Sequence, residues 1–560
     1  MSENLTKHPV YIPDTKDTDF SDFRVLIVYA NSPMDNLFPV GISSIGGMCK
    51  RHNIDYNIFD TTYYPNDGRL GVNKNNKKNN RDKVLTERLQ VAEFDYNLVG
   101  IKYIETDVFD DFRKKVLEYK PSLIMLSTVE PTHKFGVQLL KKVRDLNIPT
   151  FVGGCFAIFS PAMTIEDESV DYVCVGEGEY ASIEFCKTLA NKGDLTKVPG
   201  VWAKDDKGNI IKNPKGPLVE MGDLPMLDFN EFDEKRIYWP MSGKLWKMAP
   251  IEFSRGCPYK CTFCSAPVFE EEFKDVGTWS RSKPIPQIEN EMKYYIKELG
   301  IEYFYFVSET FLAMPKKRFE AFCEMYKKIK LPFWFNTRPE TISEEKVKML
   351  EEINCHRMSI GIESGNQKYA QTMLKRMATN DRIEDACKIV SRSSIELSVN
   401  NVVGFPDETR EMMFDTINLN RTFTANSHSC AIFQPYRGTT LHTYCVEKGY
   451  FGKDELAEDL TYASPLKQNH ITHEEIQGVA KCFALYTKLP KDMFDFIKIA
   501  EKEDAKGKKM FEELMIIYKN VYATKAESDV GGGTRYLVVK KNVEKDKIYQ
   551  KLTSILNQNY

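Results

Sequence analysis

The chain has 560 residues, of which 42% are hydrophobic and 28% charged, and its formal net charge is -3. This length predicts roughly three or four domains, and the composition excludes a disordered chain. The small net charge argues against nucleic acid as a partner. The polar N-terminus and the lack of apolar runs of about eighteen residues argue against export and membrane spanning. We therefore expect a cytoplasmic protein that acts on a small molecule or a peptide.

The region from 21 to 195 alternates apolar, β-branched runs with helical patterns, after a polar tail (1–20) that we expect to be flexible. Expected strands cover 24–33, 54–60, 121–128, 149–154 and 170–179, and expected helices cover 39–53 and 134–147. This order predicts an α/β domain with a doubly wound parallel sheet of the Rossmann or flavodoxin-like kind, which binds ligands at the carboxyl ends of its strands. A polar, low-complexity insertion (66–97) interrupts it.

A Pro- and Gly-rich connector (196–248) leads to the sequence GCPYKCTFC, which contains Cys257, Cys261 and Cys264. In a reducing compartment, such a cluster indicates metal ligation rather than disulfides. A structural zinc site needs four ligands, and no second C-x-x-C pair follows. Three thiolates on a cubane iron-sulfur cluster leave one iron without a protein ligand, so we favour a [4Fe-4S] cluster over zinc or chance clustering.

The C-x3-C-x2-C spacing resembles the signature of the radical SAM superfamily. The resemblance implies that the open iron chelates S-adenosylmethionine (SAM). It also implies that an external low-potential donor of the flavodoxin or ferredoxin type reduces the cluster, which then cleaves SAM to a 5′-deoxyadenosyl radical.

Six strand-helix repeats between 249 and 440 predict a partial (β/α)6 TIM-like barrel, in which chemistry occurs at the carboxyl ends of the strands. The motifs GIESG, VVGFPDET and FQPYRGT each stand at an expected strand end and resemble motifs of the class B, cobalamin-dependent radical SAM enzymes. A mainly helical region (441–560) follows the barrel and carries no motif.

The resemblance also implies SAM-binding residues. Glu309 matches the place of the group that binds the SAM ammonium, and Arg338 has the charge to pair with the SAM carboxylate, although it also fits a surface arginine. Glu363 and Ser364 resemble the pair that contacts the methionine or the ribose. The expected adenine wall consists of Phe263, Gly404 and Phe405.

The N-terminal domain resembles the cobalamin-binding domain that precedes the barrel in many radical SAM enzymes. Small residues at strand ends would let a corrin approach the backbone. The expected cobalamin contacts are Asn31, Ser32, Ser127, Gly153, Gly154, Gly176, Glu177 and Gly178. The sequence ANSPMDNLFPVG lacks the Asp-x-His-x-x-Gly motif, so the resemblance implies cobalamin held without a protein histidine, or an empty domain. His133 is expected to be a solvated loop residue.

Taken together, these resemblances imply an enzyme that methylates an unactivated centre through methylcobalamin. A radical cyclase or ring-contracting oxidase, similar to the anaerobic cyclase of chlorophyll biosynthesis, is the main alternative. A cobalamin sensor without catalysis is a second alternative, against which the intact cysteine triplet argues. The sequence does not identify the catalytic residues or the substrate.

Overall fold

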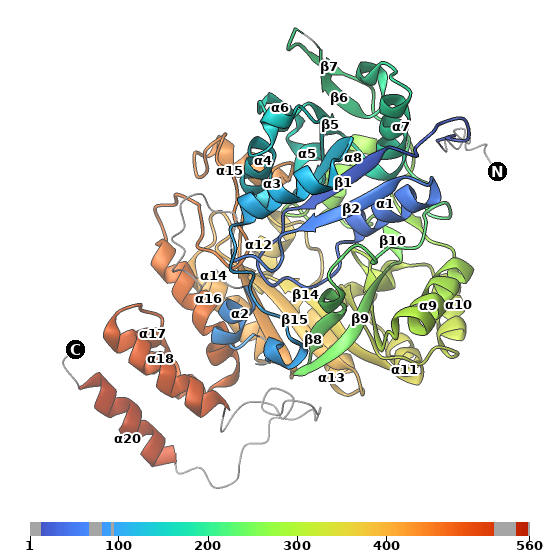
Figure 1. Cartoon of the computed structure of the whole chain (residues 1–560). Coiled ribbons are helices and arrows are strands. Elements are labelled where there is room, and N and C mark those ends of the chain that lie inside the picture. The colour runs from blue at the N-terminus through green and yellow to red at the C-terminus, as the bar shows by residue number, and fades with distance from the viewer. Residues whose placement is uncertain (1–12, 66–80, 91–94, 206, 520–544, 558–560) are drawn as a thin grey trace.

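The computed structural model describes residues 13–65, 81–90, 95–205, 207–519 and 545–557 (Figure 1). Most of the predicted N-terminal tail and of the 66–97 insertion lies outside the described residues. Within the insertion the structure describes a short helix, α2 (Arg81–Glu87).

The N-terminal domain is built on a seven-stranded sheet of order β2-β1-β3-β4-β5-β6-β7. The five strands β1 to β5 are parallel to one another, and β6 and β7 extend one edge of the sheet in the antiparallel direction. The strands are β1 (Arg24–Tyr29), β2 (Asp55–Asp60), β3 (Leu123–Ser127), β4 (Thr150–Gly153), β5 (Tyr172–Cys174), β6 (Val201–Lys204) and β7 (Ile210–Lys212). The order β2-β1-β3-β4-β5 is flavodoxin-like, and its direction reverses between β1 and β3, which is where such sheets bind ligands.

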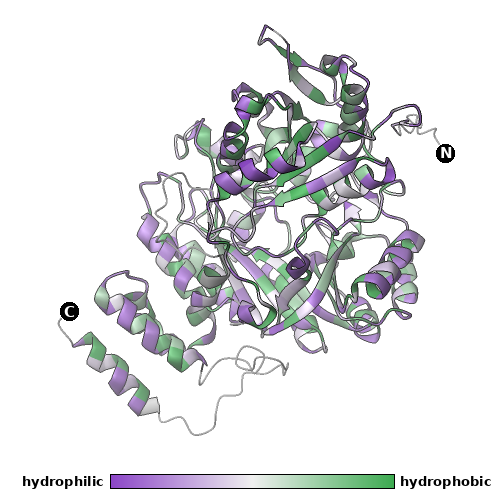
Figure 2. Cartoon of the chain, in the orientation of Figure 1, coloured by the Kyte–Doolittle hydropathy of each residue, from purple (hydrophilic) through white to green (hydrophobic). Residues whose placement is uncertain are grey.

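Helices on both faces of this sheet explain why its central strands are continuous apolar runs. In β1, Val25, Leu26, Ile27 and Val28 are all buried, as expected for a parallel strand covered on both sides. Figure 2 shows the hydropathy of the chain along its strands and helices. The helices are α1 (Val40–Arg51), α3 (Val108–Tyr119), α4 (Glu130–Lys141), α5 (Cys155–Phe159), α6 (Pro161–Glu166) and α7 (Gly178–Ala190).

The second seven-stranded sheet has the order β16-β15-β14-β13-β12-β9-β8 and curls into a half-barrel. Its strands are β8 (Tyr238–Met241), β9 (Lys244–Glu252), β12 (Tyr303–Val307), β13 (Phe333–Thr337), β14 (Cys355–Glu363), β15 (Glu396–Val403) and β16 (Ser427–Ile432). The intervening helices are α8 (Ala266–Phe273), α9 (Ile285–Leu299), α10 (Lys316–Tyr326), α11 (Glu344–Glu352), α12 (Gln367–Thr372), α13 (Asn380–Ser391) and α14 (Arg410–Asn420). Six parallel strands in chain order confirm the predicted partial (β/α)6 barrel.

The predicted connector, 196–248, differs from an irregular linker. It supplies β6 and β7 to the first sheet and β8 to the second. Between them Phe229 stacks on Phe38 of the N-terminal domain at 4.3 Å and contacts Tyr295 of α9 at 5.2 Å. A single hydrophobic core therefore runs through the connector and joins the two sheets.

The C-terminal region is mainly helical, as predicted, with its own hydrophobic core packed on α14 and β16 (Figure 1). Its helices are α15 (Thr440–Glu447), α16 (His473–Lys488), α17 (Phe494–Ala500), α18 (Ala505–Ile517) and α20 (Lys545–Leu556). In the part of the chain that the structure describes, every helix is too short or too polar to cross a bilayer.

Candidate active site

The loop that carries the three cysteines begins where a two-residue strand, β10 (Ser254–Arg255), ends. Gly256 follows with φ +102°, and a Cβ there would lie 2.7 Å from Cα of Ser280, so only glycine fits this turn. Cys257 and Cys261 are buried and Cys264 is partly exposed.

Each of the three thiols has a polar neighbour that suits a thiolate. The hydroxyl of Thr310 lies 3.3 Å from Sγ of Cys257, Nη1 of Arg338 donates to Sγ of Cys261 at 2.8 Å, and the backbone N–H of Ala266 donates to Sγ of Cys264 at 3.5 Å. Hydrogen bonds to the sulfurs are a means by which proteins tune iron-sulfur clusters.

These sulfur donors fit the predicted cluster better than they fit zinc. Among the described residues, no three Cys, His, Asp or Glu side chains are placed to hold one metal ion. A cubane differs from a zinc ion because each cysteine binds a different iron, so its thiols need not meet at one point. Burial raises the pKa of Cys264 to about 11, so cluster binding there releases a proton.

The structure gathers the predicted SAM residues at the ends of neighbouring barrel strands. Glu363 ends β14 with φ +67°, an uncommon conformation for a residue with a side chain, and Ser364 follows it. The Ser364 hydroxyl is fully buried and has no hydrogen-bond partner among the described residues. Such an orphaned buried donor points to a polar ligand.

Two carboxyl groups near the cluster loop have raised pKa values. Burial raises the pKa of Glu363, and the charges of Arg376 and Arg338 oppose this only in part. Burial by surrounding protein also raises the pKa of Glu309, although its side chain remains open to solvent. A bound cation would stabilise the charged form of either group.

The guanidinium of Arg338 already has partners within the protein, so it is not free to bind a carboxylate with all its donors. Its guanidinium pairs with Glu340 at 2.6 Å, donates to Cys261 and stacks on the ring of Tyr259 at 3.8 Å. The predicted pairing with the SAM carboxylate would have to share these donors. Arg338 is buried, which rules out the surface arginine considered from sequence.

The predicted adenine wall forms a continuous aromatic surface. The rings of Phe263 and Phe405 lie 5.5 Å apart, and Phe405 contacts Phe433 at 5.0 Å. Gly404 has φ +78°, and a Cβ there would lie 2.8 Å from Cγ2 of Ile476. The carboxylate of Glu408 accepts the backbone N–H groups of Gly404 and Phe405 and so fixes this turn.

A cavity of about 880 Å³ lies between the two domains. From the N-terminal domain it is lined by residues that follow β1, β3 and β4, including the predicted Asn31, Ser32 and Ser127. From the barrel it is lined by residues of the cluster loop and of β14, β15 and β16, including Phe263, Cys264, Glu363 and Phe405. This volume is at the upper end for cofactor sites, and short polar side chains at the sheet edge leave room for a bulky ring system.

The other predicted cobalamin residues do not line this cavity. Gly154 has φ +95°, and a Cβ there would lie 2.4 Å from the backbone oxygen of Thr128, so packing of the β3 and β4 ends requires this glycine. Gly153 precedes it at the end of β4. Gly176, Glu177 and Gly178 lie at the domain contact, and Glu177 pairs with Arg255 and Arg281 at 2.7 and 2.5 Å. The geometry thus gives the predicted corrin contact of Glu177 no support.

His133 differs from the solvated loop histidine that we expected. It lies in α4, because that helix begins at Glu130, and its ring is buried at 4.2 Å from the ring of Phe156. Burial lowers its pKa to about 4. The cavity-lining residues within the described ranges include no histidine.

Sequence reasoning missed two residues at this site. Arg376 is buried, lies 3.8 Å from Sγ of Cys261 and 3.9 Å from Glu363. Glu130 lines the cavity from α4 and accepts the backbone N–H groups of Arg437 and Ala457 at 2.8 Å, which joins the N-terminal domain to the far end of the barrel. Neither residue belongs to a motif, and only the fold brings each one to the site.

The fold and the cysteine loop define a two-domain protein in which a flavodoxin-like domain faces a radical SAM barrel. Comparison with known families agrees. Residues 251–419 match the radical SAM superfamily, and residues 83–185 match the B12 binding domain.

Individual relatives are distant. An uncharacterized methyltransferase of Pyrococcus horikoshii is 25% identical over 399 residues, which cover 69% of this chain and 84% of the relative. The anaerobic magnesium-protoporphyrin IX monomethyl ester cyclase of Rubrivivax gelatinosus is 24% identical, with 58% of this chain and 59% of that protein covered. The solved structure of the cobalamin-dependent SAM radical enzyme OxsB with aqua-cobalamin superposes with a TM-score of 0.61 at 14% identity, covering 95% of this chain and 79% of OxsB.

The chain therefore combines a radical SAM domain with a B12 binding domain, the combination expected of a cobalamin-dependent radical SAM enzyme. Its cofactors are therefore a [4Fe-4S] cluster, SAM and cobalamin. The predictions of fold class, enzyme class and cofactors are confirmed.

Proposed function

We propose that this enzyme methylates an unactivated centre of a small-molecule or peptide substrate. When bound, the cluster and SAM supply a 5′-deoxyadenosyl radical, and cobalamin supplies the methyl group. The observation that carries the proposal is the shared cavity, because Ser127 of the N-terminal sheet and Cys264 of the cluster loop line the same space. A substrate in this space would be within reach of both domains at once.

The residues around the cluster would orient SAM. Glu309, open to solvent at the end of β12, would accept the SAM ammonium, and Glu363 with the orphaned Ser364 hydroxyl would bind its polar groups. Arg376 keeps Glu363 in place by charge and by its position beside Cys261. Phe263 and Phe405 would enclose the adenine and exclude water from the reacting centre.

The test uses anaerobically reconstituted enzyme with SAM that carries a ¹³C-labelled methyl group, a low-potential reductant and a metabolite extract as substrate source. We expect 5′-deoxyadenosine and S-adenosylhomocysteine in comparable amounts and a labelled product in the mass spectrum. Labelled product without deoxyadenosine would contradict the radical step. If enzyme with a bound cluster forms neither 5′-deoxyadenosine nor S-adenosylhomocysteine, the proposed catalysis is wrong and the result favours the cobalamin sensor.

A radical cyclase or oxidase is the second candidate, supported by the 24% identity to the protoporphyrin ester cyclase. The same assay separates the two. Sustained deoxyadenosine without S-adenosylhomocysteine and without transfer of the label would favour the cyclase.

We further propose that the electron comes from an external flavodoxin- or ferredoxin-like protein that docks beside the cluster loop. A groove of about 830 Å³ is lined by residues 258–260, between the first two cysteines, and by side chains of 338–340 and 375–382. Four cations, Lys260, Arg338, Lys375 and Arg382, line it together with one carboxylate, Glu340. This charge suits an acidic redox protein, and Arg338 links the groove directly to Cys261.

Charge reversal tests this surface. Lys375→Glu should slow deoxyadenosine formation at least fivefold with a photoreduced flavodoxin as donor, because the exposed ammonium no longer attracts the acidic partner. With dithionite, which needs no docking surface, the rate should be unchanged. Lys114→Glu, at an exposed lysine on α3, is the control. Equal rates for parent and Lys375→Glu with flavodoxin would contradict the docking site.

A further inference from the structure

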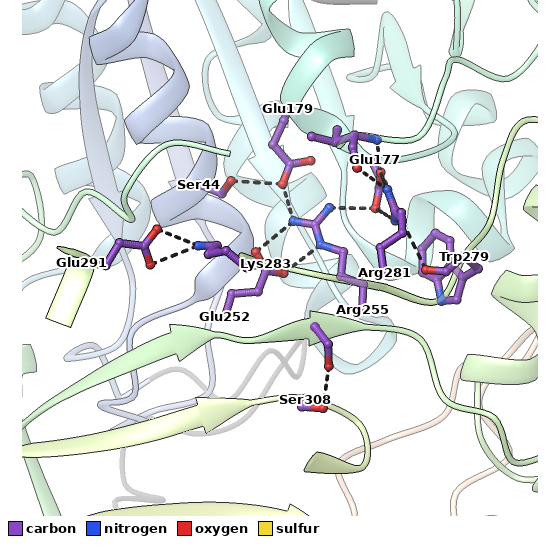
Figure 3. Close-up of polar contacts among 12 residues, drawn as sticks. Ser44, Glu177, Glu179, Glu252, Arg255, Trp279, Arg281, Lys283, Glu291 and Ser308 are labelled. Atoms are coloured by element: carbon purple, nitrogen blue, oxygen red, sulfur yellow. Dashed lines mark hydrogen bonds and ion pairs between the residues drawn. The ribbon is translucent and has the colours of Figure 1, made fainter. Parts of the chain in front are cut away.

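A network of buried charges connects the cluster loop to the N-terminal domain (Figure 3). At its centre is Arg255, the residue immediately before Gly256 and Cys257. Its guanidinium contacts three carboxylates: Glu177 at 2.7 Å, Glu179 at 2.6 Å and Glu252 at 2.8 Å. Glu177, in the β5–α7 turn, and Glu179, in the first turn of α7, belong to the N-terminal domain, whereas Glu252 ends β9 of the barrel.

The charged groups of this network are buried and paired with one another, so each of them requires its particular partners. Glu177 also pairs with Arg281 of β11 (Arg281–Ser282), the strand that pairs with β10, at 2.5 Å. Glu179 accepts the hydroxyl of Ser44 from α1 at 3.0 Å. The side chains of Arg255, Glu177 and Glu179 are 13%, 5% and 4% exposed. Buried charges cost free energy unless every partner is in place. A shift of either domain would therefore leave charged groups of the other domain unpaired.

The two ends of the network are attached to the two cofactor sites. On one side, the short β10–β11 ladder and the tight turn at Gly256 leave Arg255 little freedom to move without moving Cys257. On the other, the β5–α7 turn lies at the carboxyl edge of the sheet whose β1 and β3 ends line the cavity. This placement also explains the Gly-Glu-Gly-Glu sequence at 176–179, whose carboxylates serve the domain contact.

We propose that Arg255 is a positioning residue that couples the cluster loop to the cobalamin-binding domain, so that occupation of one cofactor site favours occupation of the other. The inference rests on the cofactor set of the proposed function. Its physical basis is reciprocity: if the cluster holds Arg255 in the geometry that pairs with Glu177 and Glu179, then cobalamin binding to the domain ordered by that pairing must favour the same loop geometry.

The test measures this coupling rather than activity. The dissociation constant of aqua-cobalamin is determined by absorbance titration for the full chain with the cluster reconstituted and for the same chain without it. In the parent protein we expect the cluster to tighten cobalamin binding about fivefold or more, the lower end of typical coupling. In Glu179→Gln, which removes one ion pair but keeps an acceptor for Ser44, the ratio of the two constants should fall toward one.

Arg255→Lys provides a second variant that keeps the charge, and a single ammonium cannot satisfy three carboxylates in the geometry of a guanidinium. It should lose the coupling while still binding each cofactor. Glu291→Gln is the control, because Glu291 and Lys283 form a fully buried ion pair at 2.9 Å that lies within the barrel alone (Figure 3). This control should keep the parent ratio.

Four results would overturn the inference. If the two cobalamin dissociation constants of the parent protein are equal, there is no coupling. If both Glu179→Gln and Arg255→Lys keep the parent ratio of these constants, the coupling runs through other residues. If Glu291→Gln loses the ratio equally, the loss reflects general destabilisation. A parent protein that binds no cobalamin in either state would contradict the cofactor assignment itself, and this inference with it.

Discussion

The two seven-stranded sheets present very different chemistry at their carboxyl edges. The strand ends of the N-terminal sheet offer short neutral side chains to the cavity, such as Asn31, Ser32 and Ser127, although the domain also adds the carboxylates of Asp35 and Glu130. The barrel offers thiols, carboxylates and guanidinium groups, many of them buried, such as Cys261, Glu363 and Arg376. The edge of the N-terminal sheet therefore leaves room for a bulky ring system, whereas the barrel edge carries the buried charged groups.

The contrast extends to how each edge is stabilised. At the N-terminal sheet, Gly154 packs against the backbone of Thr128 and the Asn31 side chain donates to the hydroxyl of Thr62. At the barrel, Arg338 and Arg376 approach the same thiol. We therefore expect substitutions at the N-terminal edge to act by size and substitutions at the barrel edge to act by charge or by loss of a ligand.

The largest effect should come from Cys261→Ala. Loss of one of three thiolate ligands should empty the cluster site, so deoxyadenosine formation should fall to background. Iron and sulfide analysis, together with chromatography of deoxyadenosine, measures this. Cys323→Ala, a buried cysteine of α10 remote from the loop sequence, is the control and should keep the cluster. A Cys261→Ala protein that retains a full cluster would refute the ligand assignment.

An intermediate effect is expected for Ser127→Trp. The indole would occupy cavity space at the end of β3, so the affinity for aqua-cobalamin should drop about tenfold or more, equivalent to roughly 1.4 kcal/mol. The cluster content should not change. Ser122→Trp, just before the amino end of the same strand, is the matched control. Should both variants bind cobalamin as tightly as the parent, the sheet edge would not be its site.

An effect on stability, rather than on cofactor binding, is expected for Glu408→Gln. Burial raises the pKa of Glu408 to about 8 although it accepts two backbone N–H groups. The unfolded chain therefore loses this proton at lower pH than the folded one, so the group's contribution to stability is full below pH 4 and lost as the pH rises toward 8. The effect is on the order of 1.4 kcal/mol per pKa unit.

Thermal unfolding at several pH values checks this. The parent protein should lose more stability between pH 5 and 9 than Glu408→Gln, whose amide has no proton to lose in this range but can still accept from Gly404. Parallel pH profiles for the two proteins would show that Glu408 is not buried as a neutral acid.

Much of this fold could be predicted from sequence because its signals are local. The barrel strands are apolar runs at regular spacing, and Cys257, Cys261 and Cys264 are adjacent in the chain. Errors arose at element boundaries and where tertiary contacts decide. We expected a helix from 134, but α4 begins at Glu130, because Pro131 fits the first turn of a helix. The strands that the structure shows within the connector have only three or four residues each, too few to recognise without the sheets they extend.

The candidate site could be predicted where its residues belong to sequence motifs. Motif residues such as Phe263, Glu363 and Phe405 were placed around one cavity. Arg376 was not found, because a basic residue between two helices carries no periodic or spacing signal. Glu177 was interpreted as a cofactor contact because Gly-Glu-Gly-Glu follows a strand, and sequence alone could not show that Arg255, 78 residues away, pairs with it.

The central claim is that iron and cobalt border one cavity between the two domains. Anomalous diffraction at the iron and cobalt edges, from anaerobic crystals of the reconstituted enzyme, tests it directly. The account predicts an iron peak beside Cys257, Cys261 and Cys264 and a cobalt peak in the space between Ser127 and Phe263. A cobalt peak outside this cavity, or zinc in place of iron at the three cysteines, would contradict it.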